Sequence, residues 1–405
     1  MSDLSETYVA RALEHLRYLA VEIGPRPSTR AGERQAAEYA AGVMRTAGLR
    51  DVRLESFRSG RSTYWPYSLA VGAGLVGNLL HLWKPGQWGA LAAALLNGLG
   101  AGGFCAEANF DDNWMRRLLP TGPSQNAIGV IPAAGDSRQR VVLLGHLDTH
   151  RTPVFYSSPL WLRLFSALVG AAFASLVLSS LAAGLNFLAG HSRRSWMGRL
   201  GMAFQAFALT MTFQAETTPY TAGANDNASG AAVALALGER LAQEPLQHTE
   251  VWVVNNGCEE LGCYGVAALL DAHGPTLRDA YFLDFDMVGL GQPTLLTREG
   301  LVRSYHPDPG LLELARQVVA RHSNLIAGEH PGGAYTDVGV VAKRGFRGLV
   351  VDSQLPPGHA ATGCMGYWHQ PHDTFDKIER ACVAKAFAFG WALLQHIDQQ
   401  FESQA

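Results

Sequence analysis

The stretch Val251–Gly265 reads VWVVNNGCEELGCYG and sets two adjacent carboxylates, Glu259 and Glu260, just beyond an apolar run. The run Val251–Val254 is uniformly apolar, as is typical of a buried strand. Burying adjacent carboxylates costs free energy unless a metal ion or a proton offsets their charge. The pair therefore indicates a site at the end of a buried strand, although a solvated loop holding two glutamates would have the same local sequence.

The bulk properties fit a large globular chain without a nucleic-acid-binding surface. The chain has 405 residues, enough for one or two domains, and 32 basic side chains stand against 35 acidic ones. A nucleic-acid-binding protein needs a concentrated basic surface, which this balance disfavours. The five cysteines are scattered, so they predict neither a disulfide framework nor a CxxC metal site.

Strand-like and helix-like patterns alternate in the parts of the chain with ordinary charge content. This alternation predicts an α/β fold with a mixed, largely parallel central sheet and helices on both faces. The expected strands are one that begins at Val52 and Leu54, then Asn126–Ile131, Arg140–Leu144, Glu250–Asn255, Tyr281–Val288 and Gly348–Val351. The expected helices are Ser5–Ile23, Arg30–Ala47, Gly230–Gln243, Tyr264–Ala272, Gly310–His322 and Lys377–Phe401.

Two blocks of the sequence are far more apolar than the rest. Each contains a pair of long apolar segments around a turn with basic residues. The segments are Ser62–Trp83 and Gln87–Ala106 around Lys84-Pro85-Gly86, and Leu164–Gly190 and Leu200–Ala215 around His191-Ser192-Arg193-Arg194. A membrane-spanning helix needs about 20 apolar residues, with a range of roughly 17–25, and only Leu200–Ala215 falls short of that range.

These blocks predict two hydrophobic helical hairpins inserted into an α/β domain. Residues 1–58, 122–152 and 221–405 would form that domain, and residues 59–121 and 153–220 would form the hairpins. We favour a multi-pass membrane location with the lipid bilayer as a partner, in which Gly72, Gly74 and Gly77 allow close helix contact. The alternative is a buried helical subdomain or an oligomer interface. The basic turns favour cytoplasmic hairpin ends, but arginines also flank the opposite ends.

Candidate metal ligands follow several of the predicted strands or precede helices. They are His146, Asp226, Glu259, Glu260, Asp286 and His369. Nitrogen and carboxylate ligands in this number suit zinc, and suit two metal ions that share one carboxylate. Each residue alone has an ordinary alternative; an aspartate before a helix, for example, is usually a cap. Asp284 and Asp286 lie on one face of the same predicted strand, so spacing leaves both open.

Five motifs, in this order, make the chain resemble the M28 family of zinc aminopeptidases. They are GHLD at Gly145–Asp148, GANDNASG at Gly223–Gly230, EELG at Glu259–Gly262, DMVG at Asp286–Gly289 and HQPHDT at His369–Thr374. The resemblance implies a zinc exopeptidase fold with two zinc ions. It also implies a division of the ligands: Asp226 would bridge the ions, His146 and Asp286 would complete one site, and Glu260 and His369 would complete the other.

The resemblance further implies roles in catalysis. Glu259 would be the general base, and Asp148 would orient the imidazole of His146. The family often has a tyrosine directly before the final histidine, whereas this chain has Trp368 there and Tyr367 one position earlier. The segment Tyr335-Thr336-Asp337 resembles the substrate-side segment of the family, and would equally fit a turn before a helix.

The function that follows from this resemblance is an aminopeptidase acting on peptide substrates. A carboxypeptidase or a glutaminyl cyclase of the same fold is an alternative, as is a membrane-anchored binding module without activity. The insertion between His146 and Asp226 is longer than is usual in the family. We therefore expect the hairpins to place the site near the bilayer and to shape access to it.

Overall fold

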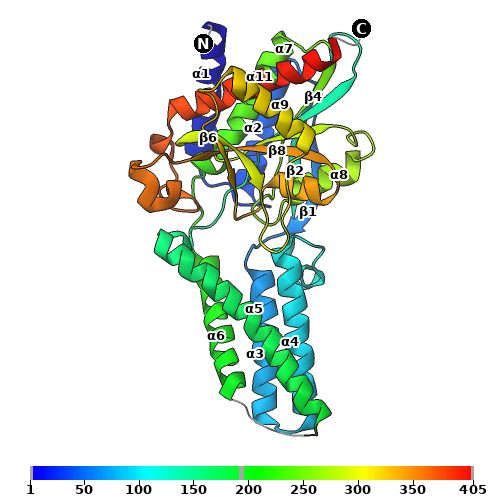
Figure 1. Ribbon diagram of the computed structural model, residues 1–405, viewed down its shortest axis with the longest axis vertical. Helices are drawn as coiled ribbons and strands as arrows, with labels where there is room; N and C mark the ends of the chain where they lie inside the picture. Colours follow the sequence, from blue (N-terminus) through cyan, green and yellow to red (C-terminus); the bar gives the residue numbers. More distant parts are fainter. Residues whose placement is uncertain (1–2, 191–195, 403–405) are drawn as a thin grey trace. The chain divides into compact units, whose positions relative to one another are not determined.

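The computed structural model describes residues 3–190 and 196–402 (Figure 1). The chain divides into two compact units. The α/β unit comprises Met1–Ser59, Gly122–His150 and Tyr220–Ala405, and the helical unit comprises Gly60–Thr121 and Arg151–Pro219. Both apolar blocks fall in the helical unit. The predicted basic turn His191–Arg194 lies outside the described residues.

The α/β unit is built on a mixed, mostly parallel sheet, which confirms the predicted fold class. Its strands lie in the order β1-β2-β4-β3-β5-β8-β6-β7. The central strands β4, β3, β5 and β8 run parallel, whereas β2 pairs with β4 and β6 pairs with β8 in antiparallel fashion. The bounds are β1 Arg50–Gly60, β2 Thr121–Ile131, β3 Gln139–Leu144, β4 Thr249–Asn255, β5 Tyr281–Phe285, β6 Gln292–Arg298, β7 Glu329–Pro331 and β8 Arg347–Gln354.

Helices cover both faces of this sheet. Successive side chains of a strand point to opposite faces, so apolar side chains on each face can pack against helices. In β8, Leu349 and Val351 join the main hydrophobic core, whereas Val350 packs in a separate cluster with Val338 of α10 (Asp337–Lys343). The main core lies under α1 (Asp3–Arg17), α2 (Ala31–Ala47), α7 (Gly230–Gln243), α9 (Pro309–Arg321) and α11 (Arg380–Glu402). The other face carries α8 (Tyr264–His273) and α10 (Asp337–Lys343), which contact each other.

Strands β6 and β7 and helix α10 of this unit were not predicted from the sequence. Strand β7 has only three residues and α10 has seven, so hydrophobic periodicity gives little signal at either. The predicted strand Tyr281–Val288 is shorter than expected. It ends at Phe285, which places Asp286 just beyond the strand.

The helical unit consists mainly of four long helices that pack side by side (Figure 1). They are α3 (Trp65–Trp83), α4 (Gln87–Ala108), α5 (Pro159–Leu188) and α6 (Trp196–Thr217). A Cβ atom on Gly77 would lie 2.9 Å from Leu96 Cβ, so α3 and α4 need glycine there to approach each other. Gly74 faces a similarly tight contact, whereas Gly72 faces open space, so the predicted role of Gly72 in close packing is wrong.

Three buried amides join the helices of this unit in a closed ring of hydrogen bonds. Asn78 Nδ2 donates to Gln205 Oε1 at 3.0 Å, Gln205 Nε2 donates to Asn97 Oδ1 at 2.8 Å, and Asn97 Nδ2 donates to Asn78 Oδ1 at 3.1 Å. Because each amide both donates and accepts, the ring satisfies polar groups that would be costly to bury alone. It therefore ties α3, α4 and α6 together without charge.

Candidate metal centre

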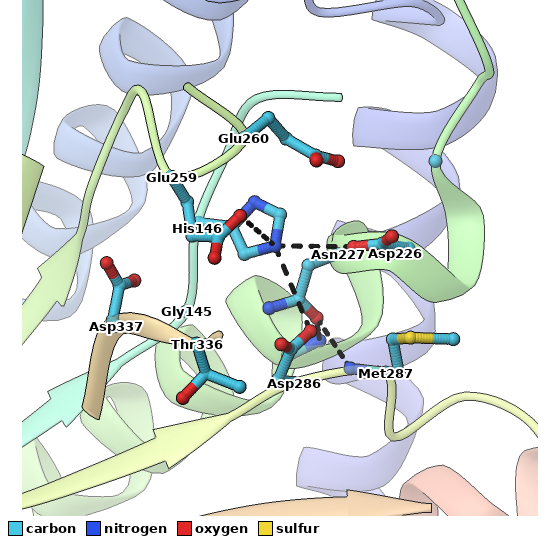
Figure 2. Close-up of polar contacts among 12 residues, drawn as sticks. Gly145, His146, Asp226, Asn227, Glu259, Glu260, Asp286, Met287, Thr336 and Asp337 are labelled. Carbon is cyan, nitrogen blue, oxygen red and sulfur yellow. Dashed lines mark hydrogen bonds and ion pairs between the residues drawn. The ribbon is translucent and has the colours of Figure 1, made fainter. Parts of the chain in front are cut away.

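His146, the glutamate pair and Asp286 lie close together at the carboxyl ends of central strands, where sites form in parallel sheets (Figure 2). His146 follows β3, and the glutamate pair follows β4. Asp286 follows β5 directly, and its backbone N–H donates to Val351 O at 3.0 Å. The short length of β5 explains why Asp286 and not Asp284 reaches the other ligands.

The first group of potential ligands is His146, Asp226 and Asp286. One ligand atom from each lies within 4.8 Å of the others. His146 Nε2 lies 3.3 Å from Asp226 Oδ1 and 3.8 Å from Asp286 Oδ1 (Figure 2). Asp286 Oδ1 is buried and accepts no hydrogen bond within the described part of the chain. A cation at this point would satisfy that oxygen.

The second group is His150, Glu260 and His369, whose ligand atoms also lie within 4.8 Å of one another. His369 Nε2 lies 3.3 Å from Glu260 Oε2 and 3.1 Å from Asp226 Oδ2. Asp226 thus directs one carboxylate oxygen toward each group. The structure therefore brings together the five residues to which the resemblance gives ligand roles. His150, which lies close to His146 in the sequence, is buried and stacks on the ring of His369.

The GANDNASG segment positions Asp226 by bonding to the segment that carries Asp286. Asn227 Nδ2 donates to Phe285 O at 2.8 Å, and Asn227 Oδ1 accepts from Met287 N at 3.1 Å. Gly230 has no room for a side chain, because a Cβ atom there would overlap Phe285 O. Asn227 and Gly230 therefore fix the distance between the segments that carry Asp226 and Asp286.

Asp373 holds the same segment from the other side. Its carboxylate accepts from the backbone N–H groups of Asn225 at 2.7 Å and Asp226 at 3.1 Å. Burial raises the pKa of Asp373 to about 7, and the backbone N–H groups oppose that shift. Because Asp373 belongs to the HQPHDT motif, the motif contributes both a potential ligand, His369, and the support for another.

Asp148 connects His146 to the glutamate pair. Its Oδ1 accepts from Glu259 N at 3.0 Å, and its Oδ2 accepts from Glu260 N at 3.1 Å and from Ser28 Oγ at 2.6 Å. Asp148 Oδ1 also lies 3.5 Å from His146 Nδ1. Asp148 is fully buried. A single carboxylate thus positions an imidazole and the backbone of both glutamates.

Arg26 is a buried support that the sequence reasoning missed. Its guanidinium donates to several backbone carbonyls around the site, among them Leu147 O at 2.7 Å and Gly223 O at 2.9 Å. Burial lowers the pKa of Arg26 to about 10, and nearby Asp373 and Asp148 raise it in opposition. The local sequence Gly24–Pro27 carries no pattern that shows these distant carbonyl partners.

Glu259 lies beside the first group of potential ligands. Its Oε2 is 3.8 Å from His146 Nε2 (Figure 2). Burial raises the pKa of Glu259 well above its ordinary value; His146 lowers it, while Glu260 raises it further. Burial therefore favours the protonated form of this carboxyl group more than water would.

The pKa values of the other ionisable side chains in the centre are also shifted. Burial raises the pKa of Glu260 to about 7, with opposition from His369. Burial lowers the pKa of His369, but the neighbouring carboxylates, chiefly Glu260, raise it more, so that it lies at about 9. The same balance holds for His146, where Glu259 contributes most to the rise. Buried carboxylates in excess of imidazoles create a demand for added positive charge.

The four residues predicted to contact substrate have different surroundings. The ring of Trp368 lies 4.5 Å from that of His369. Asp337 is buried and its Oδ2 accepts from Asn256 Nδ2 at 2.6 Å. The ring of Tyr335 contacts that of Tyr305 at 6.0 Å, and Tyr367 accepts a hydrogen bond from Gln370 N through its carbonyl. Asp337 begins α10, which agrees with the interpretation of its segment as a turn before a helix.

Comparison with known proteins identifies the family of this centre. The model of peptidase family M28 matches residues 210–393, which include Asp226, the glutamate pair, Asp286 and His369. This segment belongs to peptidase family M28. His146 and His150 lie outside the matched M28 residues but complete the two groups of potential ligands. A comparison with curated proteins found no match.

Solved structures support the M28 fold. A zinc aminopeptidase from Bacillus subtilis aligns with a TM-score of 0.55 and 15% identity over 98% of this chain and 95% of its own. An aminopeptidase from Aneurinibacillus sp. strain AM-1 gives a TM-score of 0.57 and 14% identity over 95% and 93%. A glutaminyl cyclase from an Acidobacteriales bacterium gives 0.55 and 16% over 97% and 95%. The α/β unit thus has the fold of zinc exopeptidases, and the M28 match supports a zinc-dependent hydrolase.

Proposed function

We propose that the chain is a membrane-associated aminopeptidase that uses two zinc ions. The observation that carries this proposal is the position of Asp226, whose two carboxylate oxygens face two separate groups of potential ligands. A single-metal site would need only one of these groups. A bridging carboxylate with one imidazole and one further carboxylate on each side is a donor set that suits two zinc ions.

The two adjacent glutamates would then have different roles. Glu260 contacts His369 in the second group, whereas Glu259 reaches toward His146 without belonging to either group. Zinc, when bound, polarises the scissile carbonyl and lowers the pKa of a water molecule. Glu259 would hold the proton of the attacking water. It would then deliver this proton to the amine nitrogen as the carbon–nitrogen bond breaks.

The surroundings of Glu259 support this role. Burial raises its pKa, so the carboxylate gains a proton more readily than one in water. Asp148 fixes the backbone N–H groups of Glu259 and Glu260, which keeps their side chains on different parts of the centre. On this proposal Asp148 is a positioning residue, because it acts through His146 and the glutamate backbone.

The residues we propose for substrate contact are Trp368, Tyr367, Tyr335 and Asp337. Trp368 has the best support, since its ring lies against His369 and its indole N–H is a hydrogen-bond donor. Asp337 is a buried carboxylate whose pKa burial raises to about 6. A free α-amino group of a peptide carries positive charge and would suit such an acidic surrounding.

Hydrolysis by the variant Glu259→Gln tests the activity and the general-base role together. We expect wild-type protein to release the chromophore from aminoacyl anilides, and Glu259→Gln to retain two zinc ions while losing at least about 100-fold in kcat, the scale of general-base catalysis. Glu313→Gln, an exposed change in α9, is the matched control. Cyclisation of N-terminal glutamine without peptide hydrolysis would instead favour the cyclase function. Undiminished activity in Glu259→Gln would refute the general-base assignment.

We also propose that the helical unit spans a lipid bilayer. By length and composition α4 and α5 qualify as membrane-crossing helices, with mean hydropathies of 1.4 and 2.0 in their most apolar windows. Only 33% and 22% of these windows are buried, whereas the core helix of a soluble protein is mostly buried. Exposed leucines along α5, such as Leu178, Leu181 and Leu185, support contact with lipid.

Membrane fractionation tests this location. We expect the full-length protein to stay with membranes through carbonate and high-salt washes and to be released only by detergent. Release by carbonate alone would refute the integral location, and would instead favour a helical subdomain or an interface between copies. The uncharged amide ring of Asn78, Asn97 and Gln205 supports the bilayer interpretation, since polar groups in lipid must bond to one another.

A further inference from the structure

We propose that Cys263 is a positioning residue for the side chain of Glu259. Its thiol holds one carboxylate oxygen of Glu259, so that the other oxygen faces the potential metal ligands. This inference rests on the proposed function, in which Glu259 is the general base, and names the residue that orients that base. The shared motif EELG ends at Gly262 and does not include Cys263.

The two oxygens of the Glu259 carboxylate have different neighbours. Cys263 Sγ donates to Glu259 Oε1 at 3.4 Å, whereas Glu259 Oε2 lies 3.8 Å from His146 Nε2. The terminal torsion of a glutamate is broad, so packing alone leaves the plane of its carboxylate loosely set. A donor at Oε1 fixes that plane. Oε2 is then the oxygen that is placed to take up a proton beside the first group of potential ligands.

The chain returns Cys263 to Glu259 within one turn. Cys263 N donates to Glu259 O at 2.8 Å, which brings the side chains of the two residues to the same side of the turn. The φ angle of Cys263 is +56°, in the left-handed region that favours glycine. A residue with a side chain is uncommon in this conformation, which supports a role for the thiol itself.

The surroundings keep the thiol in its protonated, donating form. Cys263 is fully buried, and burial together with the charge of Glu259 raises the pKa of its thiol well above the usual value. Among the residues that the structure describes, Cys263 is the only hydrogen-bond donor to Glu259 Oε1. Loss of the thiol would therefore leave this oxygen without a protein partner.

The carbonyl group of Thr336 is the competing acceptor. It lies 3.3 Å from Cys263 Sγ, and a thiol has only one hydrogen to donate. Hydrogen bonds to ionised groups are roughly twice as strong as those between neutral groups, which favours the carboxylate of Glu259. If the thiol donated only to Thr336 O, it would join the starts of α8 and α10 without acting on Glu259.

The S–H stretching band in the infrared spectrum tests this contact without reference to activity. The difference spectrum between wild type and Cys263→Ser isolates the band of Cys263, because serine has no S–H bond. The measurement uses zinc-loaded protein, whose added positive charge favours the ionised carboxylate. In a Glu259→Gln background the band should move to higher frequency, because a neutral amide accepts more weakly than a carboxylate. An unmoved band would overturn the proposal and assign the thiol to Thr336.

Steady-state kinetics test the consequence for catalysis. Cys263→Ala removes the donor, whereas Cys263→Ser keeps a donor of similar size. Cys382→Ala is the control, because Cys382 is equally buried but lies in α11. We expect Cys263→Ala to lower kcat about 5–10-fold, the scale of a weak donor on a charged acceptor, with KM and zinc affinity unchanged. Cys263→Ser should restore kcat, and Cys382→Ala should match wild type.

A wild-type kcat in Cys263→Ala would overturn the positioning role. So would a Cys263→Ser variant as slow as Cys263→Ala, since the loss would then not depend on the donor. Both results require a wild-type protein that hydrolyses aminoacyl anilides. Absence of hydrolysis by the zinc-loaded wild type would instead refute the proposed function.

Discussion

Replacement of Asp148 by asparagine should weaken the metal centre without removing any proposed ligand. The carboxylate accepts from Glu259 N, Glu260 N and Ser28 Oγ, and lies 3.5 Å from His146 Nδ1. Asparagine has almost the same shape but only one acceptor oxygen. Its amide nitrogen must therefore face at least one donor that the second carboxylate oxygen now satisfies.

The size of the effect follows from these contacts. A hydrogen bond to a charged group contributes about 1.5–3 kcal/mol, and a buried donor left without an acceptor costs about 1–3 kcal/mol. We therefore expect Asp148→Asn to lower the free energy of unfolding by about 2–4 kcal/mol. The mispositioned His146 and Glu260 should also lower zinc affinity by about 10–100-fold, the range for groups that orient metal ligands.

Asp398 provides a matched control far from the centre. It is also buried, and its carboxylate accepts from Gln247 N, His248 N and Thr249 Oγ1 at 2.7–2.9 Å. Thermal denaturation should show similar destabilisation for Asp148→Asn and Asp398→Asn. Chelator competition should show lower zinc affinity only for Asp148→Asn. Equal zinc affinities in the two variants would refute the positioning role of Asp148.

Three further results are expected. Zinc binding at pH 7 should release protons, because the pKa of His369 is about 9 in the metal-free protein and only the neutral imidazole binds metal. Zinc affinity should therefore fall as the pH falls below 9. Calorimetry in two buffers of different ionisation enthalpy measures the proton release, and its absence would contradict the raised pKa of His369. Gly230→Ala should lower the free energy of unfolding by about 1–3 kcal/mol in denaturant titration, because its Cβ overlaps the end of β5; unchanged stability would contradict the close packing there. Gln205→Leu should lower the melting temperature of the detergent-solubilised protein because Asn78 Nδ2 loses its acceptor, whereas the exposed change Thr210→Val should not.

Most of the residues that meet at the centre could be proposed from the sequence, because they occur in motifs that follow apolar strands or precede helices. The choice of Asp286 over Asp284 was not predictable from spacing, and needed the family resemblance. The physical reason appears in the fold: β5 ends at Phe285, so the chain leaves the sheet before Asp286. Asp284 stays within the strand, paired opposite Leu144 and Val350.

The supports of the centre were harder to predict because their partners are distant in sequence. Arg26 lies more than 120 residues before Leu147, whose carbonyl accepts from its guanidinium. His150 follows the GHLD motif, and nothing in its local sequence shows that Thr221 fixes its backbone. Strand β7 was missed for a different reason, since three residues give no hydrophobic period.

The central claim is that two zinc ions lie on either side of Asp226. Anomalous diffraction at the zinc absorption edge, from crystals of the zinc-loaded protein, tests it most directly. We predict two peaks, one among His146, Asp226 and Asp286 and the other beside Glu260 and His369. A single peak in zinc-saturated crystals, or a second peak away from Asp226, would contradict the two-metal centre.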